Sequence, residues 1–312
     1  MPTQDRRLDR QNDGDDLLSP TERRLEASAG LDALASVDVL RLLNEQDRVA
    51  VDAVAAILPQ LADVVDLAAQ RFHRGGTVHY FGAGTSGRLG LLDAAELVPT
   101  FNLEPGRVVA HIAGGADAIV NAVEDAEDSE AEGRAAAAGI GPDDVAIGLA
   151  ASGNTPYVGG ALAAAREAGA YTVLVSSNPY ATLAPLADTN IVLETGPEVL
   201  TGSTRLKAAT AEKLVLNGFS TALMVAVGRT WSNLMVSVVA TNDKLRHRTV
   251  RILQEAVGLD SDAARELLVA SDGQLKTAIV AALAGTEVAR ARELLADHAG
   301  SVRDALAAAS DT

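Results

Sequence analysis

Apolar residues follow two different periods along the chain. Between residues 31 and 72 they recur at helical spacing, which predicts helices over 31–44 and 49–72, with Pro59 bending or dividing the second and Gly75-Gly76 ending it. From Thr77 onward, short apolar runs alternate with helical stretches. The runs predict strands at 77–81, 107–112, 145–150, 171–176 and 190–193, with helices near 87–97, 116–138 and 155–168 between them. Such alternation is typical of an α/β fold, here a five-stranded parallel sheet flanked by helices, with ligands bound at the carboxyl ends of the strands.

The two ends of the chain have other patterns. Residues 1–20 mix Asp, Arg, Gln and Asn without an apolar period, which predicts a mobile tail. N-terminal helices then occupy 21–74, and the α/β domain occupies 75–228. Its last long helix begins near Ser203, a residue suited to cap it. Residues 229–312 form a C-terminal helical appendage, in which short amphipathic helices are separated by Gly273, Gly285 and Gly300.

A glycine-rich turn follows the first predicted strand and reads Gly82-Ala-Gly84-Thr85-Ser86-Gly87. Glycines allow the backbone to approach a ligand, and the N–H groups of the following helix favour a bound phosphate. The glycine spacing also fits the dinucleotide fingerprint, which needs an acid at the end of the second strand. That strand ends in Ala113-Gly114-Gly115, and the nearest acid, Asp117, lies beyond it. We therefore predict that this turn binds a phosphate group and not a nicotinamide or flavin cofactor.

The chain repeats this order of strand, glycine-containing turn and helix at the strand that ends at Ala150. The turn Ala151-Ser152-Gly153-Asn154-Thr155-Pro156 again joins hydroxyls to glycine, and Pro156 suits the first position of a helix. Two such units in one sheet predict a sugar phosphate held from two sides. For any single hydroxyl, the plainer alternative is local turn or cap bonding. The candidate ligands are Thr85, Ser86, Gly87, Ser152, Asn154 and Thr155.

Composition narrows the classes of partner. With 26 basic and 42 acidic residues the formal net charge is -16, which argues against nucleic acid and anionic membranes, so helix ends and a few cations must attract an anionic substrate. Cysteine is absent, and the five histidines show no ligand spacing, so we expect no metal and no cofactor. The first residues lack an apolar signal core, and no run approaches ~18 apolar residues. A cytoplasmic location is expected.

The combined motifs resemble the N-acetylmuramic acid 6-phosphate etherases, whose core is a sugar isomerase (SIS) domain of flavodoxin-like or Rossmann-like type. The resemblance covers roughly Thr21 to Gly258. It implies a homodimeric lyase that cleaves the lactyl ether of N-acetylmuramate 6-phosphate to N-acetylglucosamine 6-phosphate and D-lactate, in the recycling of peptidoglycan sugars. The matching stretches are GAGTSGRLGLLDAAE (82–96), AVEDAED (122–128), AASGNTPYV (150–158), GPEVLTGSTRLKAATAEKLVLN (196–217) and NLMVSVVATNDKL (233–245).

This chain departs from the family pattern beside the expected site. Leu97 and Val98 stand where the family usually has Cys and Pro, and Asn154 stands where it usually has Arg. Arg205 and Lys207 follow a glycine turn and can supply the missing cation, the alternative being an ordinary surface helix. The resemblance also points to Glu198, Ser203 and Lys207 as substrate-binding residues.

Two carboxylates carry the expected chemistry by resemblance, Glu96 as the acid toward the leaving lactate and Glu127 as the base at C2. The alternatives are a solvated carboxylate at a helix end for Glu96 and one acid of a charged helical face for Glu127. A straight helix from Ser86 to Glu96 would span ~15 Å, which is too far for one small sugar. Either the helix ends early and turns back, or Glu96 serves the site of a neighbouring subunit.

Three functions fit the sequence. The etherase is the first, an aldose–ketose phosphosugar isomerase with the same phosphate cradle is the second, and a non-catalytic sugar-phosphate sensor that regulates a partner protein is the third. The matching stretches around Glu96 and Glu127 favour the etherase.

Overall fold

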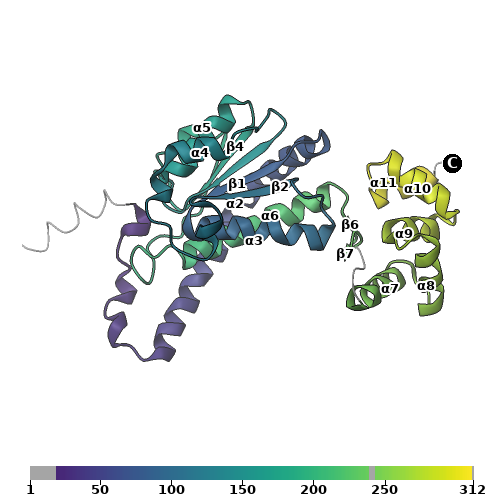
Figure 1. Cartoon of the computed structure of the whole chain (residues 1–312). Helices are drawn as coiled ribbons and strands as arrows, with labels where there is room; N and C mark the ends of the chain where they lie inside the picture. Colours follow the sequence, from purple (N-terminus) through teal and green to yellow (C-terminus); the bar gives the residue numbers. More distant parts are fainter. Residues whose placement is uncertain (1–18, 239–242, 311–312) are drawn as a thin grey trace, which may run out of the picture. The chain divides into compact units, whose positions relative to one another are not determined.

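The computed structural model describes residues 19–238 and 243–310, and Figure 1 shows the chain. The predicted mobile tail, residues 1–20, lies outside the described residues except for Ser19 and Pro20. The chain packs as two compact units. One joins the described residues up to Asp93 to Val108–Phe219, and the other joins Ala94–Arg107 to the described residues from Ser220 onward. The domain limits predicted above stay a prediction.

A parallel sheet organises the first unit. Its strands are β1 (Val78–Gly82), β2 (Val108–Ile112), β3 (Val145–Leu149), β4 (Tyr171–Ser176) and β5 (Thr189–Val192), a five-stranded sheet in the order β2-β1-β3-β4-β5. All neighbouring strands run parallel. The predicted strands and their parallel arrangement are therefore confirmed.

Helices surround the sheet and form most of the second unit. They are α2 (Ser36–His73), α3 (Gly84–Phe101), α4 (Glu130–Ala136), α5 (Pro156–Glu167), α6 (Lys207–Ala226), α7 (Asp243–Val257), α8 (Ser261–Ala270), α9 (Leu275–Ala284), α10 (Val288–Asp297) and α11 (Val302–Ser310). Short 3₁₀ turns occur at Pro20–Glu22, Glu26–Ser28, Leu31–Ala33 and Ala184–Leu186.

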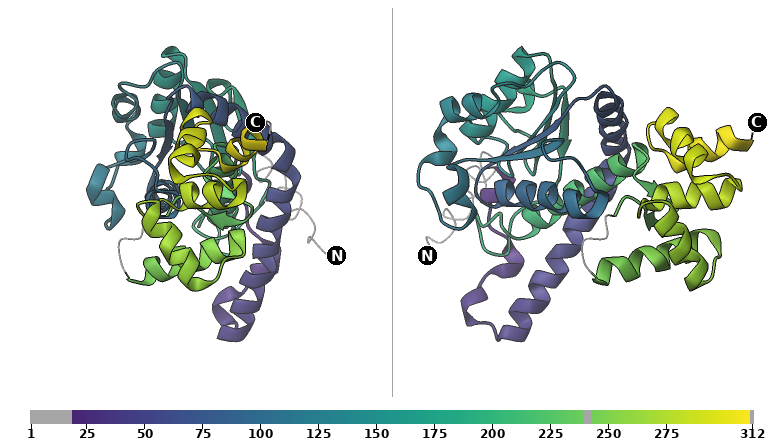
Figure 2. Two further views of the ribbon diagram at one scale, coloured as in Figure 1. Left: turned by 90° about the vertical axis from the view of Figure 1, so that its right-hand side faces the viewer. Right: turned by 45° about the vertical axis from the view of Figure 1, so that its right-hand side comes forward.

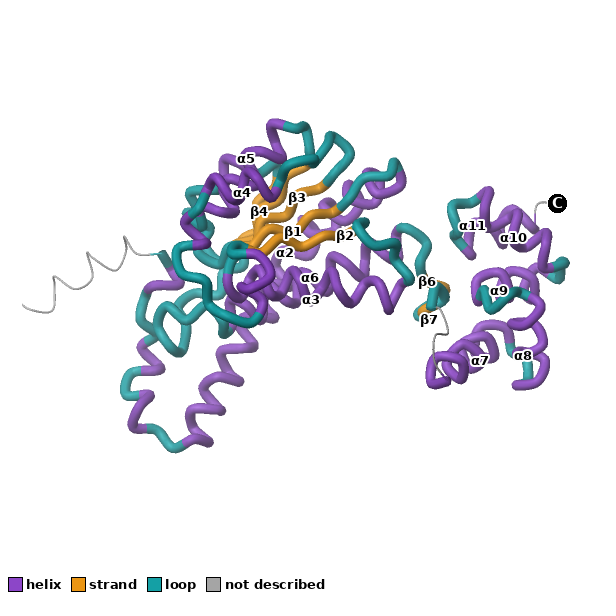
Figure 3. The backbone as a smooth tube through the Cα atoms, viewed as in Figure 1, coloured by secondary structure: helices purple, strands orange, loops and turns teal. Residues whose placement is uncertain are grey.

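The two faces of the sheet are covered by different helices (Figure 3). On one face, the Tyr80 hydroxyl donates a 3.0 Å hydrogen bond to Asp93 of α3, and its ring meets Phe219 of α6 edge-on at 6.4 Å. On the other face, Phe81 packs with Val158 and Leu162 of α5. Successive side chains of β1 thus point into two separate cores, which is why its apolar run is continuous.

Pro59 does not divide the second predicted helix, and the helices predicted over 31–44 and 49–72 form one helix. Helix α2 runs unbroken for 38 residues with Pro59 inside it, and Figure 2 shows it as one long helix. Proline removes one backbone hydrogen bond, but the following turns pack into the core through Leu61, Val65, Ala68 and Phe72. Burial of this helical stripe outweighs the local loss.

The prediction of one helix over residues 116–138 is also wrong. The segment contains the 3₁₀ turn η4 (Gly115–Ile119), the 3₁₀ turn η5 (Ala126–Asp128) and only then α4. Asp125 has a positive φ of 58°, which a helix cannot contain, and the Ser129 side chain accepts a hydrogen bond from the Glu132 N–H as the cap of α4. Local turn and cap chemistry therefore prevails over the helical composition.

Helices α4 and α5 are held together by glycines. A Cβ atom at Gly133 would collide with the backbone carbonyl of Tyr157, and one at Gly160 with the carbonyl of Glu130. Because both collisions involve backbone atoms, neither helix can accommodate a side chain there without moving. This close approach fixes the segment that precedes α4 against α5.

The second unit contains a repeated helical hairpin. The sequence Ala-Arg-Glu-Leu-Leu at 264–268 in α8 recurs at 291–295 in α10, and each copy is followed by a glycine of positive φ, Gly273 or Gly300. The Lys276 ammonium donates to the carbonyls of Gly228 and Gly300, and burial lowers its pKa to about 8.

A two-stranded hairpin, β6 (Thr230–Trp231) with β7 (Leu234–Met235), precedes these helices. The predicted helical appendage is confirmed.

The glycine contact predicts a stability change. Gly160→Ala should lower the free energy of unfolding by about 1–3 kcal/mol, because the added methyl group overpacks the α4–α5 contact. Urea denaturation followed by circular dichroism measures it. The matched control is Gly218→Ala in α6, where the nearest atom lies 3.8 Å away, and it should stabilise by about 0.4–1 kcal/mol. Equal denaturation midpoints for both variants would contradict this account of the contact.

Candidate functional site

The two hydroxyl loops begin at the carboxyl ends of neighbouring strands. β1 ends at Gly82 and β3 ends at Leu149, and these two residues are paired in the sheet. The connections from β1 and β3 leave toward opposite faces, so the loops flank the switch point of a sheet in flavodoxin-like order. The sheet itself therefore brings the two predicted loops side by side.

In the first loop, strand and helix meet at backbone contact. A Cβ atom at Gly82 would lie 2.7 Å from the Gly87 nitrogen, and one at Gly87 would lie 2.6 Å from the Ile112 side chain. Helix α3 begins at Gly84, which has a positive φ of 51°, so Thr85 and Ser86 occupy its first turn. The N–H groups of that turn have no acceptor within the helix and suit an anion. Gly87 is buried, and its N–H donates to the Ala83 carbonyl.

The second loop is tied to the loop after β4. The Asn154 side-chain oxygen accepts hydrogen bonds from the N–H and the hydroxyl of Thr182, and the Ser152 hydroxyl oxygen accepts from the Asn154 N–H. Asn154 thus braces the loop and does not act as the cation that arginine would supply. Thr155 is the N-cap residue of α5 but makes no cap hydrogen bond with its hydroxyl, which leaves it available to a ligand.

Lys207 and Glu198 form a buried pair at the start of α6. The Glu198 carboxylate accepts from the N–H groups of Lys207 at 3.2 Å and Ala208 at 3.0 Å. It is this carboxylate that caps α6, so the predicted cap, Ser203, is wrong: the helix begins four residues later in the chain, at Lys207. Burial raises the pKa of Glu198, although these N–H groups oppose the rise. The Lys207 ammonium donates to Gln46 of α2 at 2.6 Å.

These contacts change the expected roles near α6. Burial lowers the pKa of Lys207, although Glu198 opposes the fall, and the residue is 2% exposed. The ammonium therefore braces α2 against α6. Arg205 is exposed, and Ser203 is half-buried. That Ser203, Lys207 and Glu198 bind the substrate stays a prediction.

Glu127 lies exposed in η5 and not on a helical face. The turn η5 packs against α5, with Ala126 against the buried core. The glycine contact between α4 and α5 holds this segment. Glu127 therefore lies in a turn that packs against α5, the helix that Thr155 precedes as its N-cap residue. The alternative of a charged face of an α-helix fails at Glu127 because this residue lies in a three-residue 3₁₀ turn.

Glu96 is exposed on α3, which continues to Phe101 with Pro99 inside it. The helix therefore does not end early and turn back, which was the first of the two possibilities above. Leu97 is buried and Val98 is exposed. Of these two neighbouring departures from the family pattern, one therefore belongs to the core and the other to the surface of the helix.

Sequence reasoning missed one acid of this site. The Ser86 hydroxyl donates a 2.8 Å hydrogen bond to Glu212 of α6, and both residues are buried. Burial raises the pKa of Glu212 to about 7, while the Ser86 hydrogen bond lowers it. The signal was present in the sequence: Glu212 falls among Ala208, Ala211 and Val215 on the apolar stripe of its helix.

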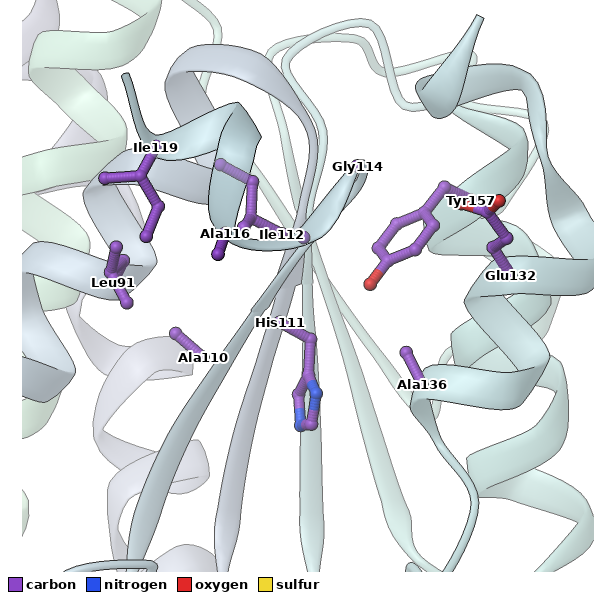
Figure 4. A pocket seen from close by; sticks show the side chains of 11 residues that line it. Leu91, Ala110, His111, Ile112, Gly114, Ala116, Ile119, Glu132, Ala136 and Tyr157 are labelled. Atoms are coloured by element: carbon purple, nitrogen blue, oxygen red, sulfur yellow. The ribbon is translucent and has the colours of Figure 1, made fainter. Parts of the chain in front are cut away.

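A separate pocket of about 410 Å³ opens at the end of β2 (Figure 4). Its polar side chains are His111, Glu132 and Tyr157, whose hydroxyl points into the space. Burial and the neighbouring His79, 3.1 Å away, lower the pKa of His111 to about 4, and burial raises the pKa of Tyr157 to about 12. Most of the remaining wall is apolar and would leave sugar hydroxyls unpaired, so the two loops are the better site. None of the predicted site residues lines this pocket.

The sheet order and the flanking helices define an α/β protein of the SIS class. The profile of the glucokinase regulatory protein N-terminal SIS domain matches residues 60–166. Over most of its length the chain belongs to the N-acetylmuramic acid 6-phosphate etherase family. It is 54% identical to the member from Thermobifida fusca (strain YX), with 85% of this chain and 87% of that protein covered. Identity is 49% to the members from Edwardsiella ictaluri (92% and 96% covered) and Streptomyces avermitilis (90% and 91% covered).

Among the helices that the structure describes, none is by itself long and apolar enough to cross a membrane. Only α8 and α9 taken together, bent by 112°, meet the criteria of length and composition.

The second loop predicts a loss of binding. Thr155→Val should weaken binding of N-acetylglucosamine 6-phosphate about 10- to 150-fold, because a hydrogen bond to a charged group contributes roughly 1.5–3 kcal/mol. Isothermal titration calorimetry measures the affinity. Thr189→Val, at the opposite end of the sheet, is the matched control and should leave the affinity unchanged. Parental affinity in the Thr155 variant would exclude a contact of this hydroxyl with the phosphate.

Proposed function

We propose that this chain is a cofactor-independent carbon–oxygen lyase. It cleaves the D-lactyl ether of N-acetylmuramate 6-phosphate to give N-acetylglucosamine 6-phosphate and D-lactate, a step in the recycling of peptidoglycan amino sugars. The observation that carries this proposal is the 54% identity to a named etherase over 85% of the chain. The paired loops at the switch point support it, because they suit a phosphorylated sugar.

The chemistry needs a base and an acid. In the open-chain sugar, the C1 aldehyde makes the C2 proton acidic. Glu127 removes that proton, the bond from C3 to the ether oxygen breaks, and Glu96 protonates the oxygen to release D-lactate. The resulting C2–C3 double bond then takes up water, with hydroxyl at C3 and a proton at C2, and the same carboxyl groups serve again.

Two carboxylates of different placement suit these roles. Glu127 sits in a turn that packs against α5, the helix that begins at the second loop. Glu96 lies ~15 Å along α3 from Ser86, beyond the reach of one sugar bound at the first turn. We therefore assign to each site its own Glu127 and the partner subunit's Glu96.

A homodimer follows from this assignment, and α2 offers a surface for it. Just before the helix and along it as far as Leu58, apolar residues are exposed: Leu34 by 42%, Val37 by 50%, Leu40 by 64%, Val51 by 55% and Leu58 by 52%. Removing such a stripe from water favours association of two copies. From Leu61 onward α2 buries one face in its own unit and so holds this stripe in place.

We place the reaction in the cytoplasm. A sugar phosphate carries about two negative charges and does not cross a lipid bilayer unaided, so its enzyme works where the sugar is phosphorylated. The isomerase and the sensor remain the competing functions. Release of D-lactate on incubation with N-acetylmuramate 6-phosphate is expected only of the etherase, and its absence would favour one of the other two.

The carboxylate pair predicts two distinct defects. Glu96→Gln should lose most D-lactate release yet still exchange the C2 proton with deuterated water, because proton removal can precede departure of lactate. Glu127→Gln should lose both activities, and each loss should be about 10²- to 10⁴-fold. Lactate assay and NMR of the sugar measure them. Parental rates in both variants would reduce these residues to surface charges, and loss of exchange in the Glu96 variant alone would reverse the roles.

The shared site predicts complementation. Mixing Glu96→Gln and Glu127→Gln subunits, after brief dissociation, should restore about a quarter of the parental rate, because half of the dimers are mixed and each has one intact site. If each site lies within one subunit, the mixture stays inactive. Glu266→Gln, an exposed acid of α8, serves as the control partner.

The exposed stripe of α2 predicts the oligomeric state. Leu40→Glu together with Val51→Glu should shift the protein toward monomer and lower activity, since charges at these positions would be buried by a partner. Sedimentation velocity measures the shift. Val269→Glu, at an apolar residue of α8 that is 79% exposed, is the control and should leave the dimer intact. An unchanged dimer in the double variant would place the interface elsewhere.

A further inference from the structure

Glu212 is an acid on the buried stripe of a helix. It is 3% exposed, and the residues at helical spacing from it, Ala208, Val215 and Leu216, are buried as well. An ionised carboxylate in such surroundings needs partners to offset its lost hydration. The family chemistry proposed above makes no use of it.

Its single partner in the described structure is the first turn of α3. Ser86 Oγ lies 2.8 Å from Glu212 Oε2, while Glu212 Oε1 is buried without a hydrogen bond from any described residue. Across residues 19–238 and 243–310, no side chain forms an ion pair with this carboxylate. On the neighbouring β1 and α3, Tyr80 is bonded to Asp93.

Along α6, the charges nearest to Glu212 are engaged elsewhere or exposed. The Lys207 ammonium is held by Gln46, and Lys213 is exposed. Burial raises the pKa of Glu212 to about 7, and the hydrogen bond from the Ser86 hydroxyl opposes this rise. The ionisation of Glu212 therefore depends on the hydrogen bond from Ser86 and on the burial of the carboxyl group.

The Ser86 hydroxyl has one proton to give. If Glu212 is ionised, it can only accept, so the serine must donate to it and can offer a phosphate nothing but lone pairs. If Glu212 is protonated, the carboxyl group can donate to Ser86 Oγ, and the hydroxyl proton becomes free for a phosphate oxygen. Protonation also removes the repulsion between a buried carboxylate and a nearby dianion.

We propose that Glu212 is a positioning residue that must be protonated for Ser86 to donate to the phosphate, so that the protein takes up one proton when the sugar phosphate binds. The inference rests on the proposed function and deepens its phosphate site. The balance is simple: a proton from solvent joins the Glu212 carboxylate, the carboxyl group donates to Ser86, and Ser86 donates to the phosphate.

The direction of the pH dependence follows. The protein binds the sugar phosphate when Glu212 is protonated and not when it is ionised. The affinity of the parental protein should therefore fall by up to tenfold per pH unit above about pH 7. The phosphate itself, with a second pKa near 6, changes little in that range. In Glu212→Gln the amide donates to Ser86 at every pH, so affinity should stay nearly constant from pH 7 to 9.

The test is calorimetric titration with N-acetylglucosamine 6-phosphate at pH 8 in two buffers of different ionisation enthalpy, which counts the protons taken up. The parental protein should take up close to one proton for each sugar bound. Glu212→Gln should take up almost none, and Ser86→Ala should take up less than the parent, because only the repulsion between Glu212 and the phosphate then links the two groups. Glu266→Gln removes an exposed acid of the same type and should match the parent.

The possible outcomes distinguish proton uptake through Glu212 from the proposed etherase function. Absence of proton uptake by the parent, equal uptake by Glu212→Gln, or no binding of the probe at millimolar concentration would overturn the inference. The parental measurement needs no variant, so the inference can be overturned even where a variant fails to fold. D-lactate release is assayed separately: its absence alongside proton uptake would overturn the etherase function and leave the inference standing.

Discussion

The site depends on the contact between the end of β1 and the first turn of α3. Gly82 and Gly87 meet there at a distance that no side chain tolerates, so the helix starts directly over the strand end with its N–H groups facing the sheet edge. The register that pairs Gly82 with Leu149 then sets the second loop beside the first. Phosphate binding, as proposed, therefore follows from backbone geometry and requires little positive charge.

A site that requires little positive charge suits a protein with a formal net charge of -16. The cation expected near the phosphate, Lys207, is committed to Gln46, and Asn154 braces a loop. Around the first turn of α3, the close side chain is an acid, Glu212, whose pKa is raised to about 7. In the proposed site an anionic ligand would meet helix termini and hydroxyls. The charge state of the buried Glu212 then matters more, because few cations lie near it to offset a negative charge.

Local signals predicted the elements well where one period dominated. Five apolar runs became the five strands, and each hydroxyl loop fell at a strand end. Prediction failed where tertiary packing or turn chemistry competed with composition. The helix α2 passes through Pro59 because its later turns are buried, and residues 116–138 break into turns around Asp125 and the Ser129 cap. At α6 the cap is Glu198, an acid brought back by a loop, where the local pattern indicated Ser203.

By itself the sequence determined the class of fold, the position of the two hydroxyl loops at strand ends and the family, because periodicity and motif spacing are local properties of the chain. Only the tertiary structure decided which groups meet. Ser86 and Glu212 stand far apart in the sequence, and their 2.8 Å contact exists because α3 and α6 share one face of the sheet. The position of Glu127 against α5 likewise depends on Gly133 and Gly160 allowing two backbones to touch. Such contacts follow from the packing of whole elements, and no local pattern in the chain encodes them.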